Sequence, residues 1–514
     1  MKRLFRGLRG EAPRDAYDAV VVGSGVGGLV AANLLAREGL SVLLVEQHYM
    51  TGGFCSTFRR AGFTFDASTH FYPLLGNPET LTGRLLAELG IETGWIRMDP
   101  VDTFHLPDGS RFAVPADFDA YRARLDAAFP AEREALDRFF AEAREAYALG
   151  LLAYFRGRTK PRLRELAPLT VREVLDRSFR DPRLKLVLTA DCPHWGSPPC
   201  RTSFVFDSML RLSYFLGNYY PAGGSQAFAD ELARRFEERG GEIAMSTRAE
   251  RIVVEDGAAR GVELEVLRGP LRGRRFRVRA GAVVANADLL QTLERLLGPE
   301  HVPAAELAAA RSLRPTYPCF LTHLGLEGVP ADELEAVQGY YWRHWDADRV
   351  GRDGLVCKVF VPTVYDPSVA PPGHQAVILQ KVQELDWRRV EDWDAHKAAV
   401  EAFVVSHLER VLPGVGKRIV VKLSATARTA ARFTLNHSGA MLGWEMSPEQ
   451  LGDGRPGIRG PVADLYLVGH WTRPGGGITP VIVSALHAAA AVLGATHDGA
   501  APAFAPREGV AHGS

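Results

Sequence analysis

The sequence has few cysteines, and they lack the spacings by which cysteines hold a metal ion or form a redox pair. Its 514 residues include five cysteines, with no C-x-x-C pair among them. An odd number without paired spacing predicts reduced thiols rather than a disulfide framework. The sequence also contains no H-E-x-x-H motif. We therefore expect no metal site.

An excess of one charge and a long apolar run are also missing. Lys and Arg together number 61, as do Asp and Glu, so the formal net charge is zero. This balance argues against broad nucleic-acid binding, which needs a basic field. The sequence contains no run of about 20 uninterrupted apolar residues, so we predict no membrane-spanning helix. The first 15 residues also lack the apolar core of a secretory signal. We expect a cytoplasmic protein.

The stretch from Tyr17 to Gly53 has the pattern of a strand–helix–strand unit. The apolar run from Ala19 to Val22 predicts a buried strand, and a second apolar strand from Val42 to Val45 runs into Glu46. Between them a helical pattern follows a turn that fits G-x-G-x-x-G, namely Gly23-Ser24-Gly25-Val26-Gly27-Gly28. A glycine turn between strand and helix, with an acid at the end of the second strand, predicts dinucleotide binding.

Residues of this unit have predicted roles toward the dinucleotide. Gly23 permits the tight turn, Gly25 lets the backbone approach a pyrophosphate, and Gly28 lets the helix pack close to the strand. The helix N-terminus offers N–H groups to the phosphates. Glu46 is placed to accept hydrogen bonds from ribose hydroxyls and would repel a 2′-phosphate. The candidate cofactor-binding residues here are Gly23, Ser24, Gly25, Gly27, Gly28 and Glu46.

Two further glycine-rich segments extend the candidate site. Gly52-Gly53-Phe54 begins six residues after Glu46, where paired glycines would bring backbone close to the dinucleotide from its other side. Near the other end, a strand over 465–468 leads into a turn and an Ala-rich helix, and the candidate residues of this turn are Gly469, His470, Gly475, Gly476, Gly477 and Ile478. The helix N-terminus would again face the ligand, and a plain strand–turn–helix is the alternative.

These motifs together resemble the FAD-dependent family of phytoene desaturases, carotenoid isomerases and retinol saturases. The resemblance covers most of the chain and rests on three separated segments: Gly52-Gly53 followed by F-D-A-S-x-H over 65–70, Y-P-A-G-G over 220–224, and 465–478. It implies an α/β fold with a doubly wound, Rossmann-like FAD-binding domain of the glutathione-reductase/amine-oxidase type and an inserted α+β substrate domain. It also implies that the flavin lies at 475–477 and that the segment 248–251 passes the adenine. Relatives among the amine oxidases usually carry Asp where this chain has His470.

The expected organisation alternates cofactor and substrate segments. We expect FAD-binding segments at 16–75, 218–300 and 421–498, substrate segments at 76–217 and 301–420, and a disordered tail at 499–514. The segment 76–217 is expected to be helical, and separate short strands are expected over 251–254, 261–266, 275–278 and 282–285.

The segment from Phe139 to Phe155 allows two interpretations. It reads FFAEAREAYALGLLAYF, and five basic residues follow up to Arg164. An apolar helical face beside a basic run is typical of a helix on a membrane surface, which would make the protein peripherally membrane-associated. The alternative is an amphipathic helix buried against its own domain.

The resemblance implies an FAD-dependent oxidoreductase that acts on carbon–carbon bonds of a carotenoid- or retinoid-like polyene, by desaturation or saturation. An extended polyene would lie in an apolar tunnel, and hydride would pass between a chain carbon and flavin N5. His70 follows a cofactor-binding loop, so it is the candidate catalytic side chain near the flavin, with a structural histidine as the alternative.

Three other functions remain open on the same sequence. One is redox-neutral cis–trans isomerisation of a carotenoid by reduced FAD, and the second is an amine-oxidase-type reaction. The third is non-catalytic binding of an apolar ligand, as in the escort proteins for lipidated GTPases that share this fold. The completeness of the cofactor motifs favours an enzyme over a binding protein.

Overall fold

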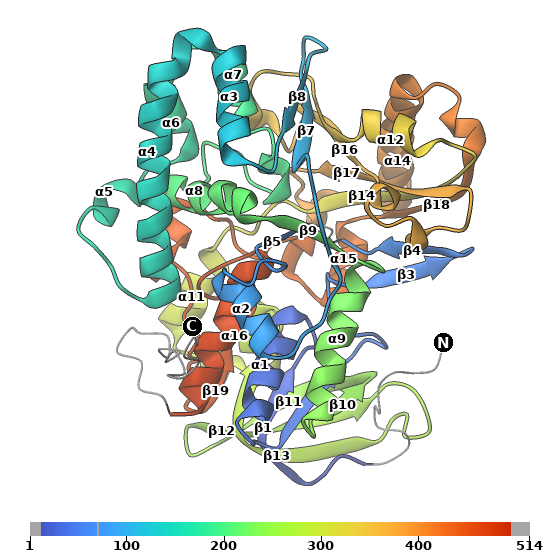
Figure 1. Ribbon diagram of the computed structural model, residues 1–514. Coiled ribbons are helices and arrows are strands. Elements are labelled where there is room, and N and C mark those ends of the chain that lie inside the picture. Colours follow the sequence, from blue (N-terminus) through green and yellow to red (C-terminus); the bar gives the residue numbers. More distant parts are fainter. Residues whose placement is uncertain (1–11, 69–70, 495–514) are drawn as a thin grey trace, which may run out of the picture.

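The computed structural model describes residues 12–68 and 71–494. The candidate His70 and the tail predicted at 499–514 lie outside the described residues. Two large β-sheets lie at opposite ends of the molecule, and a group of helices lies beside the second sheet (Figure 1). No helix in the described part is both long and apolar enough to cross a bilayer.

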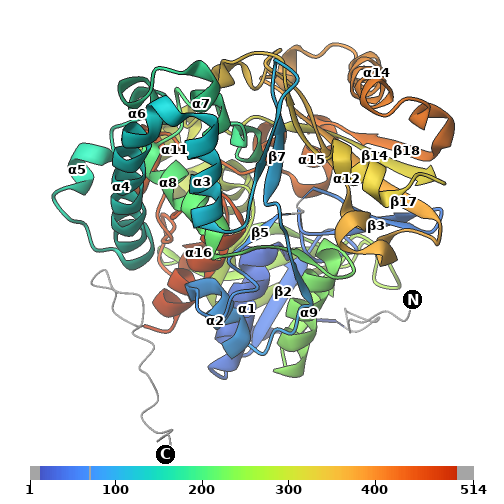
Figure 2. The ribbon, with the colours of Figure 1, turned by 45° about the horizontal axis from the view of Figure 1, so that its top comes forward.

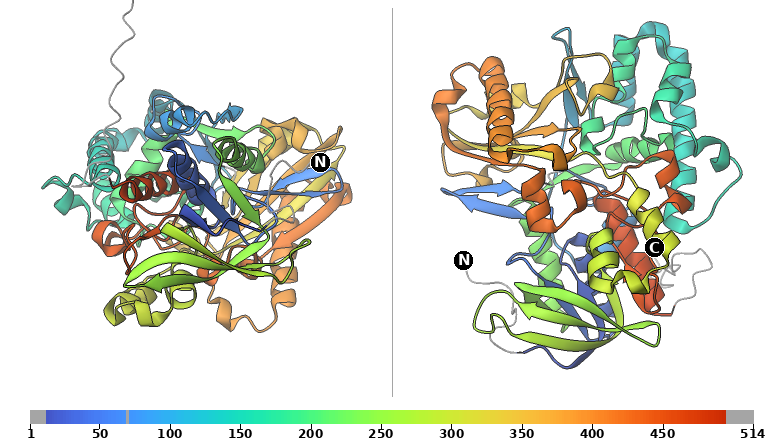
Figure 3. Two further views of the ribbon diagram at one scale, coloured as in Figure 1. Left: turned by 90° about the horizontal axis from the view of Figure 1, so that it is seen from below. Right: turned by 180° about the vertical axis from the view of Figure 1, so that it is seen from behind.

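The first sheet is doubly wound and takes its strands from separate parts of the chain. Its order is β10 (Glu242–Met245), β2 (Val42–Glu46), β1 (Ala16–Val22), β13 (Arg275–Ala285), β12 (Ala258–Val266) and β11 (Thr247–Glu255), and β19 (Leu465–Leu467) also pairs with β13. The central strand β1 pairs in parallel with β2 and β13. Figure 3 shows this sheet from below, with light-green β11–β13 beside the blue parallel strands. The predicted α/β, Rossmann-like fold is confirmed.

Both faces of β1 are buried, as its continuous apolar run predicts. Ala19 and Val21 pack with three helices on one face, α1 (Val26–Arg37), α9 (Ser225–Glu238) and α16 (Ile478–Val492). Val20 and Val22 pack on the opposite face, in a cluster that includes side chains of β12 and β13. A parallel strand covered on both sides has no need of polar alternation, which explains its sequence.

The two strands expected over 275–278 and 282–285 form one strand, β13. The expected break is absent because β1 pairs with β13 from residue 279 to residue 285. The opposite edge of β13 is shared, since residues 275–279 pair with β12 and residues 283–285 pair with β19. The carboxyl end of β13 therefore lies between β1 and the last strand of the chain.

The second sheet is mainly antiparallel. Its order is β18 (Ile419–Ala425), β14 (Cys319–Glu327), β17 (His374–Val382), β16 (Leu355–Phe360), β15 (Gly339–Trp342), β7 (Asp102–His105) and β8 (Arg111–Val114). Its outer face is covered by α14 (Trp393–Val411), whose Val404 and Leu408 pack with apolar residues of the sheet (Figure 2). The inner face of the second sheet is not covered by α14, and it faces the first sheet.

The prediction that 76–217 is helical is wrong for residues 95–114. This part contains β6 (Trp95–Arg97) and the hairpin of β7 and β8, which turns at Asp108-Gly109. Phe112 and Val114 are buried while Arg111 is exposed, so the apolar period is two rather than 3.6. An Asp-Gly turn between alternating residues is a hairpin signal that outweighs the helical composition around it.

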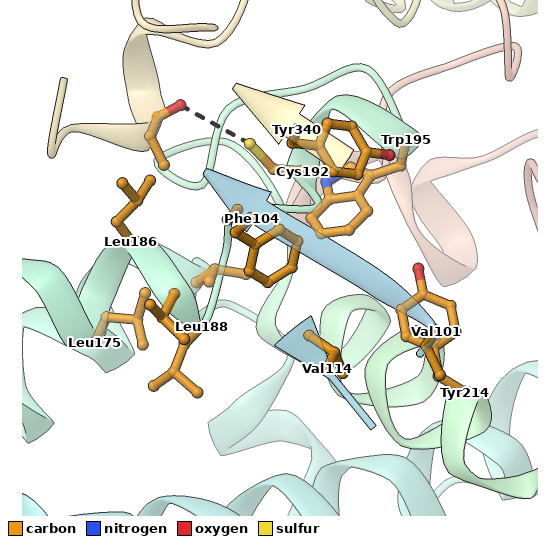
Figure 4. Close-up of a cluster of buried hydrophobic side chains, with 14 of the residues drawn as sticks. Val101, Phe104, Val114, Leu175, Leu186, Leu188, Cys192, Trp195, Tyr214 and Tyr340 are labelled. Carbon is orange, nitrogen blue, oxygen red and sulfur yellow. Dashed lines mark hydrogen bonds between the residues drawn. The ribbon is translucent and has the colours of Figure 1, made fainter. Parts of the chain in front are cut away.

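The helices of the second region enclose a separate apolar core. They are α3 (Phe118–Ala128), α4 (Arg133–Gly150), α5 (Leu163–Leu166), α6 (Val171–Ser178), α7 (Pro182–Val187) and α8 (Phe204–Ser213). Figure 4 shows Phe104 and Val114 of the hairpin among side chains from these helices. In α4, Phe139 and Phe140 are buried in this core, so the apolar face of α4 packs against its own domain.

Shorter elements complete the chain. The small strands are β3 (Thr57–Arg60), β4 (Phe63–Asp66), β5 (Tyr72–Pro73) and β9 (Asn218–Pro221). The remaining α-helices are α2 (Leu81–Glu88), α10 (Leu289–Gln291), α11 (Ala304–Ser312), α12 (Ala331–Val337), α13 (Pro362–Tyr365) and α15 (Ala427–Thr434).

Candidate cofactor and substrate site

A cavity of about 750 Å³ extends from the carboxyl edge of the first sheet to the inner face of the second. Its floor includes the residues at or just after the ends of β1, β2, β13 and β19, namely Val22, Glu46, Asn286 and Gly469. Ligands of open α/β sheets bind outside the carboxyl ends of the strands, so the cavity lies where the fold favours a ligand. Its volume is within the range of about 300–1,000 Å³ that is usual for cofactor and ligand sites.

The structure brings the predicted cofactor residues together at this floor. The predicted residues that line the cavity are Gly23, Gly25, Gly27, Glu46, Gly52, Gly53, Phe54, Gly469, His470, Gly476, Gly477 and Ile478. Ser24, Gly28 and Gly475 lie behind this lining. Segments far apart in sequence, including 23–54 and 469–478, thus form one wall.

Close backbone contacts explain several of the glycines. A Cβ atom at Gly28 would lie 2.0 Å from the carbonyl oxygen of Gly23, so helix α1 starts too close to β1 for any side chain there. Gly25 forms a bridge with Gly52, and the Gly52 N–H donates to the Ser24 carbonyl at 2.8 Å. The loop that follows β2 is therefore fixed directly on the glycine turn.

Asn286, the residue after β13, contacts the glycines of both motifs. A Cβ at Gly25, Gly27 or Gly469 would lie only 2.8–2.9 Å from its side-chain amide atoms. Its Nδ2 donates to the Gly23 carbonyl at 3.3 Å. Sequence analysis missed this residue as part of the site. The available signal was its position at the end of a strand that returns to the cofactor sheet.

Two of the helices that begin at the cavity are not capped by a side chain. The N-cap residues are Gly25 for α1 and Gly477 for α16, and within the described residues no side chain accepts a hydrogen bond from either first turn. The free N–H groups and the positive dipole ends each stabilise a nearby anion by about 0.3–1 kcal/mol. This arrangement fits the pyrophosphate of a dinucleotide.

Glu46 is held in place by backbone and side-chain donors. Its Oε2 accepts from the Ser24 N–H and the Ser24 hydroxyl, both at 2.8 Å, and its Oε1 accepts from the His48 N–H at 2.7 Å. The carboxylate is half-buried and lines the cavity. Since a carboxylate has about four acceptor sites, it retains capacity for a ligand hydroxyl. Ser24, although behind the lining, positions this group.

His470 is half-buried at the cavity floor, close to the buried cation of Arg455. Burial of the ring, with a smaller effect from the nearby Arg455, lowers the pKa of His470 to about 3. The buried Arg455 guanidinium donates to the His470 carbonyl at 2.9 Å and to other backbone carbonyls. His470 is therefore neutral at physiological pH. It offers the cavity a neutral imidazole where a carboxylate would carry a negative charge.

The far half of the cavity is mainly apolar. Its lining includes Phe71, Tyr147, Leu151, Phe155, Trp195, Phe206, Met209, Leu210, Leu321, Tyr340, Val382 and Leu442. Most of these side chains come from the helical region and from the second sheet, while the polar motifs come from segments of the first sheet. The cavity thus joins a dinucleotide site to a chamber for an apolar molecule.

The fold and this two-part cavity define a dinucleotide-dependent enzyme with a separate substrate chamber. The family described as "Flavin containing amine oxidoreductase" matches residues 26–493, and the chain belongs to that family. The protein is an oxidoreductase, and its cofactor is FAD. Three features fit this cofactor: the uncapped N-termini of α1 and α16, the close contact between Gly25 and Gly52, and Glu46.

Related proteins divide between two activities. The chain is 29% identical to a phytoene desaturase (neurosporene-forming) of Cereibacter sphaeroides, over 92% of this chain and 93% of that protein. It is 28% identical to prolycopene isomerase 1 of an Oncidium hybrid cultivar, over 93% of this chain and 85% of that protein. Among solved structures, putrescine oxidase bound to putrescine matches with a TM-score of 0.67 at 16% identity, covering 94% of this chain and 100% of that one. This last likeness concerns the fold.

We expect Asn286→Leu to weaken FAD binding by about tenfold or more and to destabilise the apoprotein by about 1–3 kcal/mol. The substitution removes the amide that bonds to Gly23 and leaves buried polar backbone without a partner. Titration with FAD and thermal unfolding measure the two effects. Asn77→Leu is the matched control, because it removes an amide hydrogen bond to Leu216 away from the cavity. Equal FAD affinity in both variants would contradict the role of Asn286.

We expect His470→Gln to reduce the loss of stability on acidification. The folded-state pKa of His470 is depressed to about 3, against about 6.5 in the unfolded chain. Its stabilising contribution is therefore complete above pH 6.5 and is lost as pH falls from there toward 3. Between pH 7 and pH 5 this loss is about 2 kcal/mol, which the variant lacks. Denaturant unfolding at both pH values measures it.

The matched control for this experiment is His344→Gln, because the His344 side chain is 42% exposed. The same pH dependence in wild type and His470→Gln would show that His470 ionises freely in the fold.

Proposed function

We propose that this enzyme acts on carbon–carbon bonds of an apolar polyene of the carotenoid or retinoid type, by desaturation or saturation. The observation that carries the proposal is the continuity of the cavity, in which a mainly apolar chamber opens directly on the dinucleotide motifs. A chamber with such walls offers a long hydrocarbon chain extensive burial and few polar partners. The names of the phytoene desaturase and the prolycopene isomerase described above agree with this substrate class.

We further propose that the residues at the floor hold FAD. The first turns of α1 and α16 would receive its phosphates and the flavin end of the cofactor, and Glu46 would accept hydrogen bonds from a ribose. When bound, FAD supplies the centre that accepts or donates hydride. The chain itself contributes binding, orientation and exclusion of water. His470, which is neutral, would provide hydrogen bonding without adding a charge near the cofactor.

His70 remains the proposed catalytic side chain near the flavin. The residues on either side of the 69–70 segment support this, because Ser68 and Phe71 both line the cavity. The far chamber is walled by aromatic and aliphatic groups, so the protein's contribution to chemistry is mainly a dry site and alignment of the polyene.

Redox-neutral cis–trans isomerisation is the second candidate. It is favoured by the prolycopene isomerases, which are as similar to the chain as the desaturases are. The two reactions need the same cofactor and the same apolar chamber, and they differ in net electron flow. An experiment that follows both flavin state and polyene spectrum separates them.

We expect purified protein to bind FAD in near-stoichiometric amount and to change the absorption spectrum of an added cis-carotene. Lengthening of the conjugated system by oxidised enzyme, in which flavin accepts hydride, supports desaturation. Shortening of the conjugated system by reduced enzyme, in which flavin donates hydride, supports saturation. A spectral change seen only with dithionite-reduced enzyme, with no double bond gained or lost and no flavin oxidised, supports isomerisation. His70→Ala should lower turnover in the same assay, and unchanged turnover and flavin spectrum would exclude His70. No carotene change, together with peroxide release from an amine, would overturn the proposal in favour of an amine oxidase.

We also propose that the mouth of the chamber rests on an anionic lipid surface. The cavity reaches Leu151 and Phe155, which follow α4. Leu151 and Tyr154 are half-exposed, and the basic side chains that come next, Arg156, Arg158 and Lys160, are exposed and make no ion pair within the described part of the chain. Apolar groups flanked by unpaired cations suit contact with anionic headgroups. A polyene would then enter from the bilayer.

Sedimentation with vesicles tests this contact. We expect binding to vesicles of phosphatidylcholine and phosphatidylglycerol, and a loss of roughly 3 kcal/mol in the triple variant Arg156→Gln/Arg158→Gln/Lys160→Gln, since each cation contributes about 1 kcal/mol near the surface. The control Arg272→Gln/Arg274→Gln/Arg275→Gln makes the same charge change on the distant β12–β13 hairpin. An equal loss in both variants would show that net charge, not this mouth, causes binding.

A further inference from the structure

One transverse row of residues in the second sheet forms part of the wall of the substrate chamber. Tyr340 pairs with Lys358, Lys358 with Gln380, and Gln380 with Leu321 across four neighbouring strands. Side chains that pair across strands point to the same face of a sheet. All four residues line the cavity, so this face is the inner one. Two polar side chains, Lys358 and Gln380, therefore lie side by side in a mainly apolar wall.

Lys358 is a buried cation with a fixed orientation. Its side chain is 2% exposed, and its Nζ lies 2.8 Å from Oδ2 of Asp102 on β7. The same ammonium donates to the Tyr340 hydroxyl at 3.3 Å and lies 5.3 Å from the centre of the Phe71 ring. An ammonium has three donors, and these two bonds use two of them. The third is left for a group in the cavity that Lys358 lines.

Gln380 has polar capacity that the protein does not use. Its side chain is half-buried, and its amide makes no hydrogen bond among the described residues. A polar group without a partner becomes costly once an apolar ligand has excluded water from it. A pure hydrocarbon would impose this cost, whereas a ligand with an oxygen atom at this point would not.

We propose that Lys358 and Gln380 form a recognition site for an uncharged oxygen group, a hydroxyl or carbonyl, on the polyene substrate. The inference rests on the proposed polyene function and narrows it to an oxygenated member of that class. The oxygen accepts a hydrogen bond from the remaining N–H of Lys358. The Gln380 amide accepts a hydrogen bond from a hydroxyl or donates one to a carbonyl. A carboxylate is disfavoured, because Asp102 already balances the Lys358 charge and would repel a second anion.

The ion pair also has a structural role that must be separated from recognition. Lys358 on β16 and Asp102 on β7 connect strands on either side of β15. Changing Lys358 alone would leave Asp102 buried without a partner, which is strongly destabilising. Gln380→Leu breaks no bond within the described structure, and the pair variant Asp102→Asn/Lys358→Met removes both charges together.

The test measures how tightly two probes bind to the full, FAD-loaded chain. Binding is monitored by the quenching of tryptophan fluorescence. The probes are lycopene and the same polyene with one terminal hydroxyl. We expect wild type to bind the hydroxylated probe about tenfold more tightly, the scale of one hydrogen bond to a charged group. We expect Gln380→Leu and Asp102→Asn/Lys358→Met each to reduce this preference, mainly by weakening the hydroxylated probe.

The matched control is Lys381→Met. Lys381 is the next residue on β17 after Gln380, but its ammonium donates to the Leu355 carbonyl and it does not line the cavity. This variant should keep the wild-type preference. Equal affinity of wild type for both probes would overturn the inference and leave the polyene function intact. Failure of wild type to bind either probe would instead overturn the polyene function, and the inference with it.

Discussion

The site depends on how closely three backbone segments approach one another at the carboxyl edge of the first sheet. Gly23 to Gly28 and Gly469 meet around Asn286, and Gly53 lies against Gly25, with no room for a Cβ at several of these positions. This contact sets where α1 and α16 begin and hence where their unpaired N–H groups point. Glycine is required here because of the surrounding atoms as well as the turn geometry. The cofactor end of the cavity is therefore a consequence of packing within the sheet.

The second sheet contributes the other half of the cavity by a different principle. Its outer face is closed by α14 and its inner face is left for the ligand. Because side chains alternate between faces, every second residue of each strand is available to the chamber. One sheet face thus contributes apolar side chains and a few polar ones to the chamber, and the helical region contributes the rest of its apolar wall. The first sheet positions the residues that bind a dinucleotide, and the second sheet positions residues that contact the substrate.

Local sequence signals predicted the cofactor sheet and most of the cavity floor. The strand–glycine–helix pattern and the acid at Glu46 depend on neighbouring residues, so they can be read without knowing the fold. Asn286 was missed because one asparagine after a strand has no spacing to mark it, and the only signal was its place after the strand that returns to the cofactor sheet. The pairing of Lys358 with Asp102 was also invisible, since it joins residues far apart in the chain. The β7–β8 hairpin was missed although its Asp-Gly turn was present, because the composition around it is typical of helices.

The position of the last strand and helix has a consequence for biosynthesis. The floor of the cavity needs β1 and β2 from near residue 20 to 46, and it also needs the turn at 469–478. A chain that leaves the ribosome from its N-terminus cannot complete the site until this late segment has emerged. Until then the edge of β13 that receives β19 is unpaired, and the floor lacks the uncapped N-terminus of α16. The complete cofactor site therefore forms only near the end of synthesis of this segment. Incomplete chains lack the stabilisation that FAD bound to the complete site provides.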